Sequence, residues 1–327
     1  MTLPTVHVYV LGGTITMAAG SGGGIAPKLT GDDLLAQVPG LDKVARLGVK
    51  TPFLKPGASL TFKEIADVAA LIEADSADGY VVVQGTDTID ETSYLLDLLH
   101  QGAEPVVVTG AMRGAAALSA DGPANIMAAI HTAAHPDAAD RGVLVVLNDE
   151  MHNARDVEKM NKGLVQAFQS PNRGPVGFYL EGHPRFMRRP DARPVLNLKP
   201  ECFGRVAIIK ASLDCDDALL RAAPDLGYDG VVLEATGAGH VPGQLLEAVD
   251  SVLARIPMVL ASRVPAGPVF QNTYGFPGSE MDMIRRGAIP AGWLSPHKAR
   301  LLMSVALGSG FSAAQIRQVF ERAAMAP

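Results

Sequence analysis

Seven short apolar runs constrain the fold of this chain more than any other feature of its sequence. Each run is continuous, has four to six residues and ends at a glycine or a polar loop. The runs are Val6–Leu11, Tyr80–Gln84, Val106–Thr109, Val143–Asn148, Val206–Ala211, Gly230–Ala235 and Met258–Ser262. Because they are continuous rather than alternating between apolar and polar residues, they are typical of strands covered on both faces, as in parallel sheets.

Helical patterns lie between many of these runs. Thr61 is followed three residues later by Glu64, which forms a capping-box pattern ahead of apolar residues at helical spacing. Ser295 precedes Pro296, the residue favoured at a first helical position, and Ser312 begins a third pattern of this kind. The alternation of strands and helices predicts an α/β architecture with parallel sheets.

A proline-rich segment divides the chain. Residues 182–200 contain four prolines and show little periodicity, and a chain of 327 residues fits about two domains. We therefore predict a larger N-terminal parallel-sheet domain over residues 1–185, a linker over 186–205 and a smaller C-terminal α/β domain over 206–327.

Composition excludes several classes of partner. Hydrophobic residues make up 48% and charged residues 19%, which fits a globular protein. The net charge is −6 and there is no dense lysine or arginine run, so no nucleic-acid partner is expected. No apolar stretch approaches the roughly 18 residues of a membrane span. The start of the sequence lacks the basic region of a signal peptide, and the two cysteines suit a reducing compartment, so we predict a cytoplasmic protein.

Two strand ends carry clusters of hydroxyl and carboxylate side chains. "LGGTIT" at residues 11–16 follows the first run and "QGTDT" at residues 84–88 follows the second. Open α/β sheets bind ligands beyond the carboxyl ends of their strands. A threonine hydroxyl is a weak nucleophile that needs a base, and a lysine that has lost its charge in a partly dry cleft can be that base. Each threonine could equally cap a helix or close a turn.

Patterns for other chemistries are missing from the sequence. It contains no GxGxxG, no Walker loop, no HExxH and no GxSxG. His131 and His135 have a spacing that could place both on one helix face, but they lack a carboxylate partner and are interpreted as ordinary surface or core residues. We therefore predict neither a cofactor nor a metal site.

Six motifs in a fixed order resemble a known family. They are "GGTIT", "GTDTIDET", "VTGAMRGAAALSADGPANI", "RGVLVVLND", "RDVEKMN" and "SRVPAG". Together with the late "KARLLMSVAL", they are similar over essentially the whole chain to the bacterial L-asparaginase and glutaminase-asparaginase family. The resemblance implies hydrolysis of the side-chain amide of asparagine through an acyl-threonine, without a cofactor, in a homotetramer built from intimate dimers.

The resemblance also implies roles for individual residues. Thr14 is the expected nucleophile, and Thr86 with Lys159 as proton acceptor is expected to activate a hydroxyl or a water molecule. Asp87 is expected to bind the α-ammonium group of the substrate, so Thr86 and Asp87 belong to the substrate-binding set as well as to the catalytic set. The acidic residues 90–91 are expected to favour the N-terminus of the following helix electrostatically.

The sequence departs from the family pattern where the amino-acid head group is bound. The family's lid tyrosine has no counterpart within residues 15–35. In the loop "KPGASLT", Gly57 and Ala58 stand where the family has a serine followed by glutamine or glutamate, although a gap of one residue restores Ser59. We expect Ala58 and Ser59 to line the substrate site and to bind the head group weakly.

Further departures lie in the C-terminal half. His240, Tyr274 and Asn272 stand where the family has residues that face the site of a neighbouring subunit. Two other functions therefore stay open: an amidohydrolase that prefers glutamine or another small carboxamide, and a non-catalytic amino-acid-binding protein on the same scaffold. The second is less consistent with the sequence, because binding alone needs neither a nucleophile nor a base.

Overall fold

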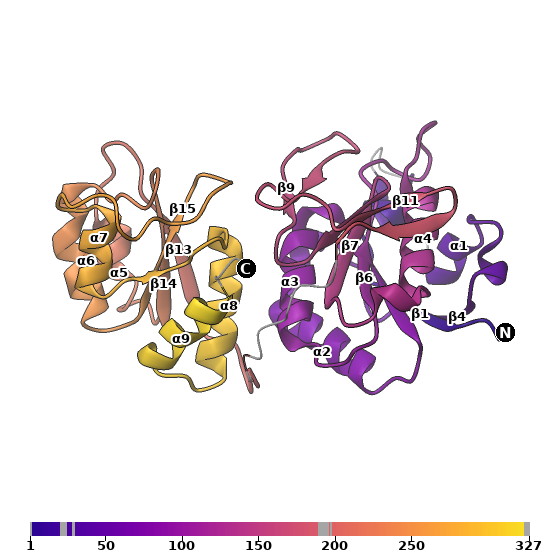
Figure 1. Ribbon diagram of the computed structural model, residues 1–327, viewed down its shortest axis with the longest axis horizontal. Helices are drawn as coiled ribbons and strands as arrows, with labels where there is room; N and C mark the ends of the chain where they lie inside the picture. The colour runs from indigo at the N-terminus through magenta and orange to yellow at the C-terminus, as the bar shows by residue number, and fades with distance from the viewer. Residues whose placement is uncertain (1, 20–24, 28–29, 189–195, 197, 324–327) are drawn as a thin grey trace. The chain divides into compact units, whose positions relative to one another are not determined.

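The chain forms two compact units. The computed structural model describes residues 2–19, 25–27, 30–188, 196 and 198–323. Unit 1 comprises Met1–Arg193 and unit 2 comprises Pro194–Pro327 (Figure 1). The division falls within the predicted linker 186–205, of which residues 189–195 and 197 lie outside the described part of the chain.

Unit 1 is built on an eight-stranded sheet with the order β12-β11-β8-β7-β6-β5-β1-β4. Its strands are β1 (Thr5–Val10), β4 (Arg46–Lys50), β5 (Gly79–Val83), β6 (Val106–Thr109), β7 (Val143–Leu147), β8 (Glu150–Asn153), β11 (Gly177–Leu180) and β12 (His183–Phe186). Five adjacent strands of this sheet, in the order β7-β6-β5-β1-β4, pair in parallel. The predicted larger parallel-sheet domain is confirmed in this part of the sheet.

The other edge of this sheet was not predicted. β8, β11 and β12 pair antiparallel with their neighbours, so the sheet is mixed. β7 and β8 are joined by Asn148 and Asp149, whose φ angles of 52° and 61° are those of a tight hairpin turn. Short strands with half-exposed residues leave no continuous apolar run, which is why the sequence pattern missed them.

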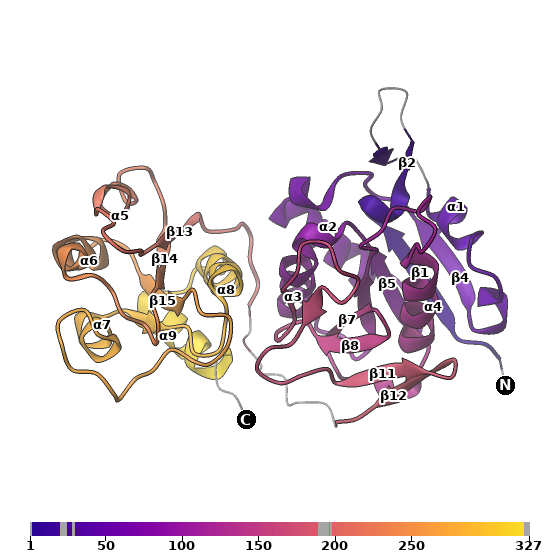
Figure 2. The ribbon, with the colours of Figure 1, turned by 90° about the horizontal axis from the view of Figure 1, so that it is seen from above.

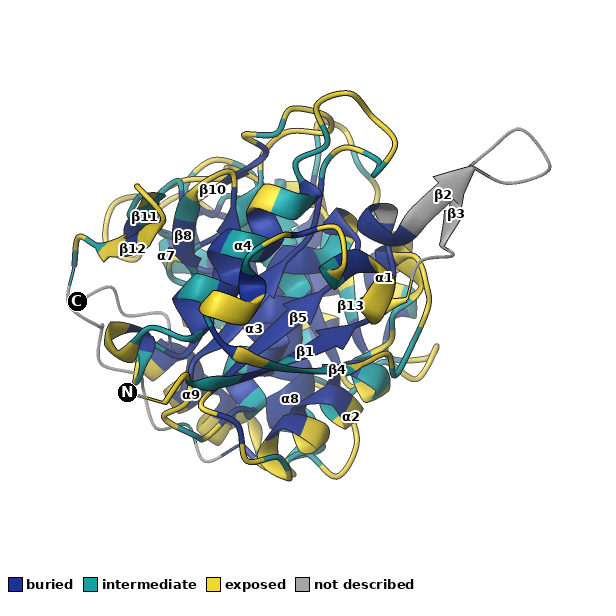
Figure 3. Ribbon diagram, turned by 90° about the vertical axis from the view of Figure 1, so that its right-hand side faces the viewer, coloured by how far each residue is buried: buried dark blue, intermediate teal, exposed yellow. Residues whose placement is uncertain are grey.

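Helices cover both faces of the sheet in unit 1. They are α1 (Gly31–Leu35), α2 (Phe62–Glu73), α3 (Ile89–Leu99) and α4 (Gly122–Ala133). α1 and α4 lie on one face, and α2 and α3 lie on the other (Figures 1 and 2). The valines of β1, β5 and β6 are fully buried between these layers, and Figure 3 shows β5 as buried along its length.

Smaller elements complete unit 1. Two short antiparallel pairs are β2 (Met17–Ala19) with β3 (Ile25–Pro27), and β9 (Glu158–Lys159) with β10 (Phe168–Gln169). Short 3-10 helices span Thr14–Thr16, Leu41–Lys43, Gly57–Ser59, Thr86–Thr88 and Pro136–Ala138. His131 lies on α4, whereas His135 lies beyond the end of that helix. The expectation that both could share one helix face is therefore wrong.

Unit 2 is a smaller α/β unit, as predicted. Its sheet has the order β13-β14-β15-β16 and all of its pairs are parallel. The strands are β13 (Val206–Lys210), β14 (Gly230–Ala235), β15 (Met258–Ser262) and β16 (Ile289–Pro290). The helices are α5 (Ala218–Ala222), α6 (Leu246–Leu253), α7 (Glu280–Arg286), α8 (Pro296–Gly308) and α9 (Ala313–Ala323), with a further 3-10 helix at Gly243–Leu245.

The predicted helix starts are confirmed. Thr61 and Glu64 form a capping box at the start of α2. Pro296 is the first residue of α8, and the Ser312 hydroxyl hydrogen bonds with Gln315 just before α9. Among the helices of the described ranges, none is long and apolar enough to cross a membrane.

A charged network ties the edge of the sheet in unit 1 to the end of α2. Asp75 Oδ2 accepts hydrogen bonds from Tyr9 Oη at 2.6 Å and Lys50 Nζ at 2.9 Å, and lies 2.7 Å from His7 Nδ1. Burial alone would raise the pKa of Asp75, but the hydrogen bonds from Tyr9, His7, Lys50 and the Ser76 N–H outweigh it and hold this pKa well below its usual range. The ionised carboxylate therefore stabilises the folded state.

We expect Asp75→Asn to lower the free energy of unfolding at pH 7 by about 2–3 kcal/mol, because the buried Tyr9 hydroxyl and Lys50 lose a charged acceptor. A carboxyl whose pKa is depressed on folding contributes stability above its unfolded pKa of about 4, and loses it as the pH falls further. The difference between the two proteins should therefore shrink below about pH 4. Urea denaturation at pH 7 and near pH 3 measures both quantities.

The control is Asp67→Asn on α2. Asp67 pairs with Lys63 on the exposed surface, and exposed pairs contribute little. An Asp75→Asn protein that is no less stable than this control at pH 7, or whose deficit is the same at both pH values, would contradict the role assigned to the network.

Candidate active site

Three loops meet at the carboxyl ends of the parallel strands in unit 1. Gly13 follows β1 with a φ of 92°, and a Cβ on it would overlap the backbone of Gly85, which follows β5. On the other side of Gly85, a Cβ on Gly57 would lie 2.8 Å from the Gly85 carbonyl oxygen. Only glycine fits these contacts, and the residues that follow Gly13 and Gly85 are thereby brought to the same edge of the sheet.

The loop after β1 begins with Thr14. This residue is the first of a 3-10 helix, and its side chain lies outside the described part of the structure. Thr16 closes the turn, because its backbone N–H and its hydroxyl both donate to the Gly13 carbonyl, at 2.9 and 2.8 Å. The structure thus places the Thr14 backbone directly after the contact between Gly13 and Gly85, and its role as nucleophile stays a prediction.

Thr86, Asp87 and Lys159 come together although the lysine is more than 70 residues away in the sequence. Lys159 Nζ donates hydrogen bonds to Thr86 Oγ1 at 3.0 Å and to Asp87 Oδ1 at 2.9 Å. Thr86 is buried, the Lys159 side chain is 17% exposed and the Asp87 side chain is 67% exposed. The ammonium group therefore bridges a buried hydroxyl and a carboxylate that faces solvent.

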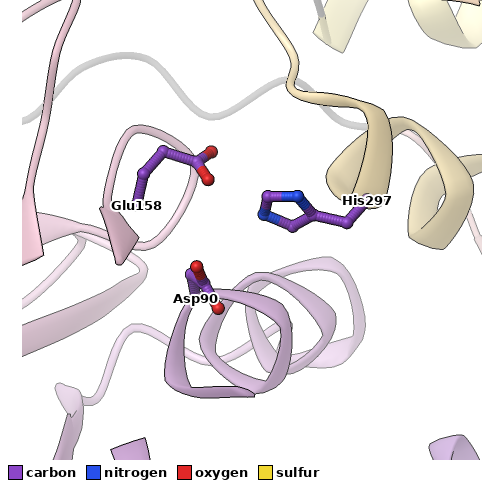
Figure 4. A group of neighbouring side chains, drawn as sticks. All are labelled: Asp90, Glu158 and His297. Carbon is purple, nitrogen blue, oxygen red and sulfur yellow. The ribbon is translucent and has the colours of Figure 1, made fainter. Parts of the chain in front are cut away.

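The hairpin that carries Lys159 is anchored on α3. β9 pairs with β10 over two residues, and the Met160 N–H donates to the Ala167 carbonyl at 2.7 Å. The Lys159 N–H instead donates to Asp90 Oδ2 at 3.0 Å. Figure 4 shows Asp90 on the first turn of α3, beside Glu158 on β9. The contact between Asp90 and Lys159 was not predicted, since the sequence suggested only an effect on the helix N-terminus.

A second anchor holds the other strand of the hairpin. Ser170 follows β10, and its hydroxyl lies 3.0 Å from Nδ1 of His152 on β8. His152 Nε2 is 3.3 Å from the Glu150 carboxylate. This order of serine, histidine and acid is that of a hydrolase triad, but the serine and histidine are both buried. We interpret the group as a support for β10 rather than as a second reactive centre.

The predicted substrate loop is held against the loop after β5 by a hydrogen bond. The Thr88 hydroxyl donates to the Gly57 carbonyl at 3.1 Å, and the buried Gln84 amide donates to the Gly85 carbonyl at 3.3 Å. Gly57 is buried, whereas Ala58 and Ser59 are exposed. The loop thus offers one side-chain hydroxyl to the surface, and its part in substrate binding stays a prediction.

The motif "SADGPANI" supports the next strand end along the sheet. Asp121 accepts the backbone N–H groups of Met112 and Arg113, each at 2.9 Å. The buried Asn125 donates to the Gly110 carbonyl at 2.9 Å. Gly110 in turn packs closely against Thr86, since a Cβ on it would lie 3.4 Å from Thr86 Cγ2. These residues hold the loop after β6 in place, a supporting role that the sequence did not reveal.

In unit 2, His240 and Tyr274 form an aromatic cluster with Phe276. The ring centroid of His240 lies 4.7 Å from that of Tyr274 and 5.1 Å from that of Phe276. Behind them the fully buried Glu280 accepts the N–H groups of Thr273 and Tyr274, at 3.0 and 2.7 Å. Burial alone would raise the pKa of Glu280, but these N–H groups and the nearby imidazole outweigh it and lower the pKa. The loop that also carries Asn272 is thus fixed by a buried carboxylate.

Comparison with known proteins covers both units. The family model "Asparaginase, N-terminal" matches residues 5–192. The model "Glutaminase/Asparaginase C-terminal domain" matches residues 205–320. The two matched ranges lie in unit 1 and unit 2 respectively.

Individual relatives are similar along nearly their whole length. The chain is 32% identical to L-asparaginase 2 of Escherichia coli strain K12, over 98% of this chain and 94% of that protein. It is 36% identical to a probable L-asparaginase of Deinococcus radiodurans, over 98% of each chain. It is 31% identical to a glutaminase-asparaginase of Pseudomonas aeruginosa, over 97% of this chain and 90% of that protein. The chain therefore belongs to the asparaginase family of amidohydrolases.

Proposed function

We propose that this protein hydrolyses the side-chain amide of L-asparagine to L-aspartate and ammonia through a covalent threonine intermediate. The observation that carries the proposal is the hydrogen bond between Lys159 Nζ and the buried Thr86 hydroxyl, with Asp87 on the solvent side. A hydroxyl, a potential base and a fixed carboxylate at one strand end are the groups that amide hydrolysis of an amino acid requires. The names of the relatives support the choice of substrate.

The reaction has two steps. In the first, the Thr14 hydroxyl loses its proton and its oxygen attacks the amide carbon, and the amide nitrogen takes up a proton and leaves as ammonia. In the second, water attacks the resulting ester, the acid is released and the Thr14 hydroxyl is restored. Backbone N–H groups of the glycine turns stabilise the negative oxygen that forms in each step.

Lys159 and Thr86 move the protons. In the substrate-free arrangement the ammonium donates to the Thr86 hydroxyl. Once the lysine has passed one proton to solvent, its nitrogen accepts the Thr86 proton, and Thr86 in turn takes one from the attacking hydroxyl or water. The same relay returns this proton to the leaving amide nitrogen in the first step and to the Thr14 oxygen in the second. The low exposure of Lys159 favours this exchange, because few water molecules compete for the amine.

Asp87 recognises the substrate. Its exposed carboxylate attracts the α-ammonium group of the amino acid through a charge-assisted hydrogen bond. In the free protein the same carboxylate is paired with Lys159. The arriving α-ammonium therefore competes with the lysine for Asp87.

Glutamine is the second candidate substrate. One relative named glutaminase-asparaginase is 31% identical to this chain, and the exposed loop at Ala58 and Ser59 presents no carboxylate or amide side chain. A non-catalytic binding protein is the weaker alternative, because binding does not require the contact between Lys159 and Thr86.

We also propose a homotetramer of intimate dimers in a reducing cytoplasm. The assembly rests on the family resemblance. The compartment is supported by the two free cysteines, Cys202 and Cys215. A relative from Haemophilus influenzae that is 34% identical to this chain is named as a probable periplasmic L-asparaginase, so cell fractionation tests the compartment. Light scattering tests the assembly.

Thr14→Ala should lower kcat for asparagine by at least about 10³-fold without unfolding the protein, because it removes the covalent nucleophile. Thr14→Ser, which keeps a hydroxyl, is the control and should retain more activity. Ammonia release measures turnover, and mass spectrometry of acid-quenched protein should find the acyl group on the peptide that contains Thr14. Near-normal turnover of Thr14→Ala would rule out this nucleophile.

Thr86→Val and Lys159→Met should each lower kcat by at least about 10²-fold, and the double variant should be little worse than either one. Residues that act as one proton-handling unit show such non-additive losses. Lys162→Met changes an exposed lysine on the same hairpin and should leave kcat unchanged. If the two losses multiply in full, Thr86 and Lys159 act independently.

The native protein should have a high KM for asparagine and a weak preference among amino-acid amides, because the loop at Ala58 and Ser59 offers few contacts to the head group. Ala58→Gln or Ser59→Glu should lower KM about tenfold, since one added charge-assisted hydrogen bond contributes roughly 1.5–3 kcal/mol. The measurement is kcat/KM for asparagine and glutamine in each protein.

Ala58→Leu is the control for this change, since it adds a side chain that cannot hydrogen bond. A micromolar KM in the native protein, with sharp rejection of glutamine, would contradict the prediction. In that case His240 or Tyr274 of a neighbouring copy would be the first residues to test for recognition.

A further inference from the structure

We infer that Asp90 is a positioning residue, which holds the backbone of Lys159 so that its ammonium end reaches Thr86. The inference rests on the proposed function, in which Lys159 exchanges protons with Thr86. It concerns a carboxylate that the sequence suggested only as a favourable charge at a helix end.

Asp90 is held firmly by its own helix. It lies in the first turn of α3 and is 7% exposed. Its Oδ1 accepts the N–H of Glu91 at 3.0 Å, and its Oδ2 accepts the N–H of Lys159 at 3.0 Å. The positive end of the helix dipole favours a carboxylate here, and both hydrogen bonds are charge-assisted. The side chain therefore connects a rigid element to a chain segment 69 residues away.

The hairpin of Lys159 has little structure of its own to fix the lysine. β9 and β10 have two residues each and form a separate sheet rather than joining the large one. Two-stranded pairs of this size are marginally stable by themselves. At Lys159 the backbone N–H bonds to Asp90, so the contact with α3 sets the position of this residue.

The two ends of the lysine are held by one continuous segment. Thr86 and Asp87 contact the ammonium end, and Asp90, three residues after Asp87, contacts the backbone end. The 3-10 helix Thr86–Thr88 runs directly into α3. The proposed base, Lys159, and its partner hydroxyl on Thr86 are thus positioned relative to the same rigid turn. A displacement of about 1 Å in such a pair can lower the rate about 10²-fold.

Removal of the carboxylate should affect turnover more than binding. Asp90→Ala should lower kcat for asparagine about 10- to 100-fold and change KM less than about threefold. Asp90→Asn keeps one acceptor oxygen and should lose less. The matched control is Asp282→Asn in unit 2, where a carboxylate in the first turn of α7 also accepts a backbone N–H, that of Gly278. Asp282→Asn should leave kcat unchanged even if it lowers the melting temperature as much as the Asp90 variants do.

A double-variant comparison separates positioning from a general structural role. If Asp90 acts through Lys159, Asp90→Ala should cause no further loss of activity in a Lys159→Met background. If the two losses multiply instead, Asp90 acts by another route and the inference is overturned. Should Asp90→Ala fail to fold, the same comparison is made with Asp90→Asn.

Amide hydrogen exchange tests the contact without using activity. In Asp90→Ala the Lys159 N–H should exchange at least about tenfold faster than in the native protein, while the Met160 N–H, bonded to the Ala167 carbonyl, should change less. Unchanged exchange at Lys159 would overturn the inference even in an active enzyme. If the native protein released ammonia from no amide, the proposed function would fail, and the exchange result would still decide whether Asp90 holds Lys159.

Discussion

The close approach of Gly13 and Gly85 is the contact on which the site depends. The two backbones approach so closely that no Cβ fits at Gly13, and this contact brings the loop after β1 against the loop after β5. Each glycine is followed at once by a threonine, Thr14 or Thr86. The parallel sheet brings the two strand ends together, and the missing side chains let the chain turn there. A Cβ at Gly13 would overlap the Cα and N atoms of Gly85, so a larger residue there would displace the two loops that carry Thr14 and Thr86.

The groups around Lys159 differ in solvent exposure, which increases from the buried Thr86 to Asp87. Thr86 is buried, the lysine is mostly covered and Asp87 is largely exposed. The exposed carboxylate can meet a charged substrate without the cost of stripping water from an isolated ion. In the proposed mechanism, the lysine and the hydroxyl exchange protons deeper in, where water competes least. The single turn of backbone from Thr86 to Asp90 thus carries both the buried hydroxyl and the exposed carboxylate.

The sequence was most informative where burial is complete. Continuous apolar runs predicted β1, β5, β6 and β7 to within one residue at each end, because strands covered on both faces need apolar residues throughout. The antiparallel edge was missed because its short strands have one face in solvent. That Thr86 and Lys159 would meet followed only from the family resemblance, and the bond from Lys159 to Asp90 could not be foreseen, since no local pattern marks a contact over 69 residues.

In the proposed mechanism, discrimination between asparagine and glutamine arises away from Lys159 and Thr86. The two substrates carry the same head group and the same amide, and differ by one methylene between them. In the proposed reaction Asp87 holds one end of the substrate and the two threonines act at the other end, so the distance between the two loops would decide which side chain reaches the nucleophile. The close contact between Gly13 and Gly85 constrains that distance on one side. On the other side, the turn at Gly57 presents only the small, exposed Ala58 and Ser59. A methylene difference is worth only about 1–3 kcal/mol in a binding pocket. With so few side chains to exploit it, we expect this chain to discriminate only weakly between asparagine and glutamine.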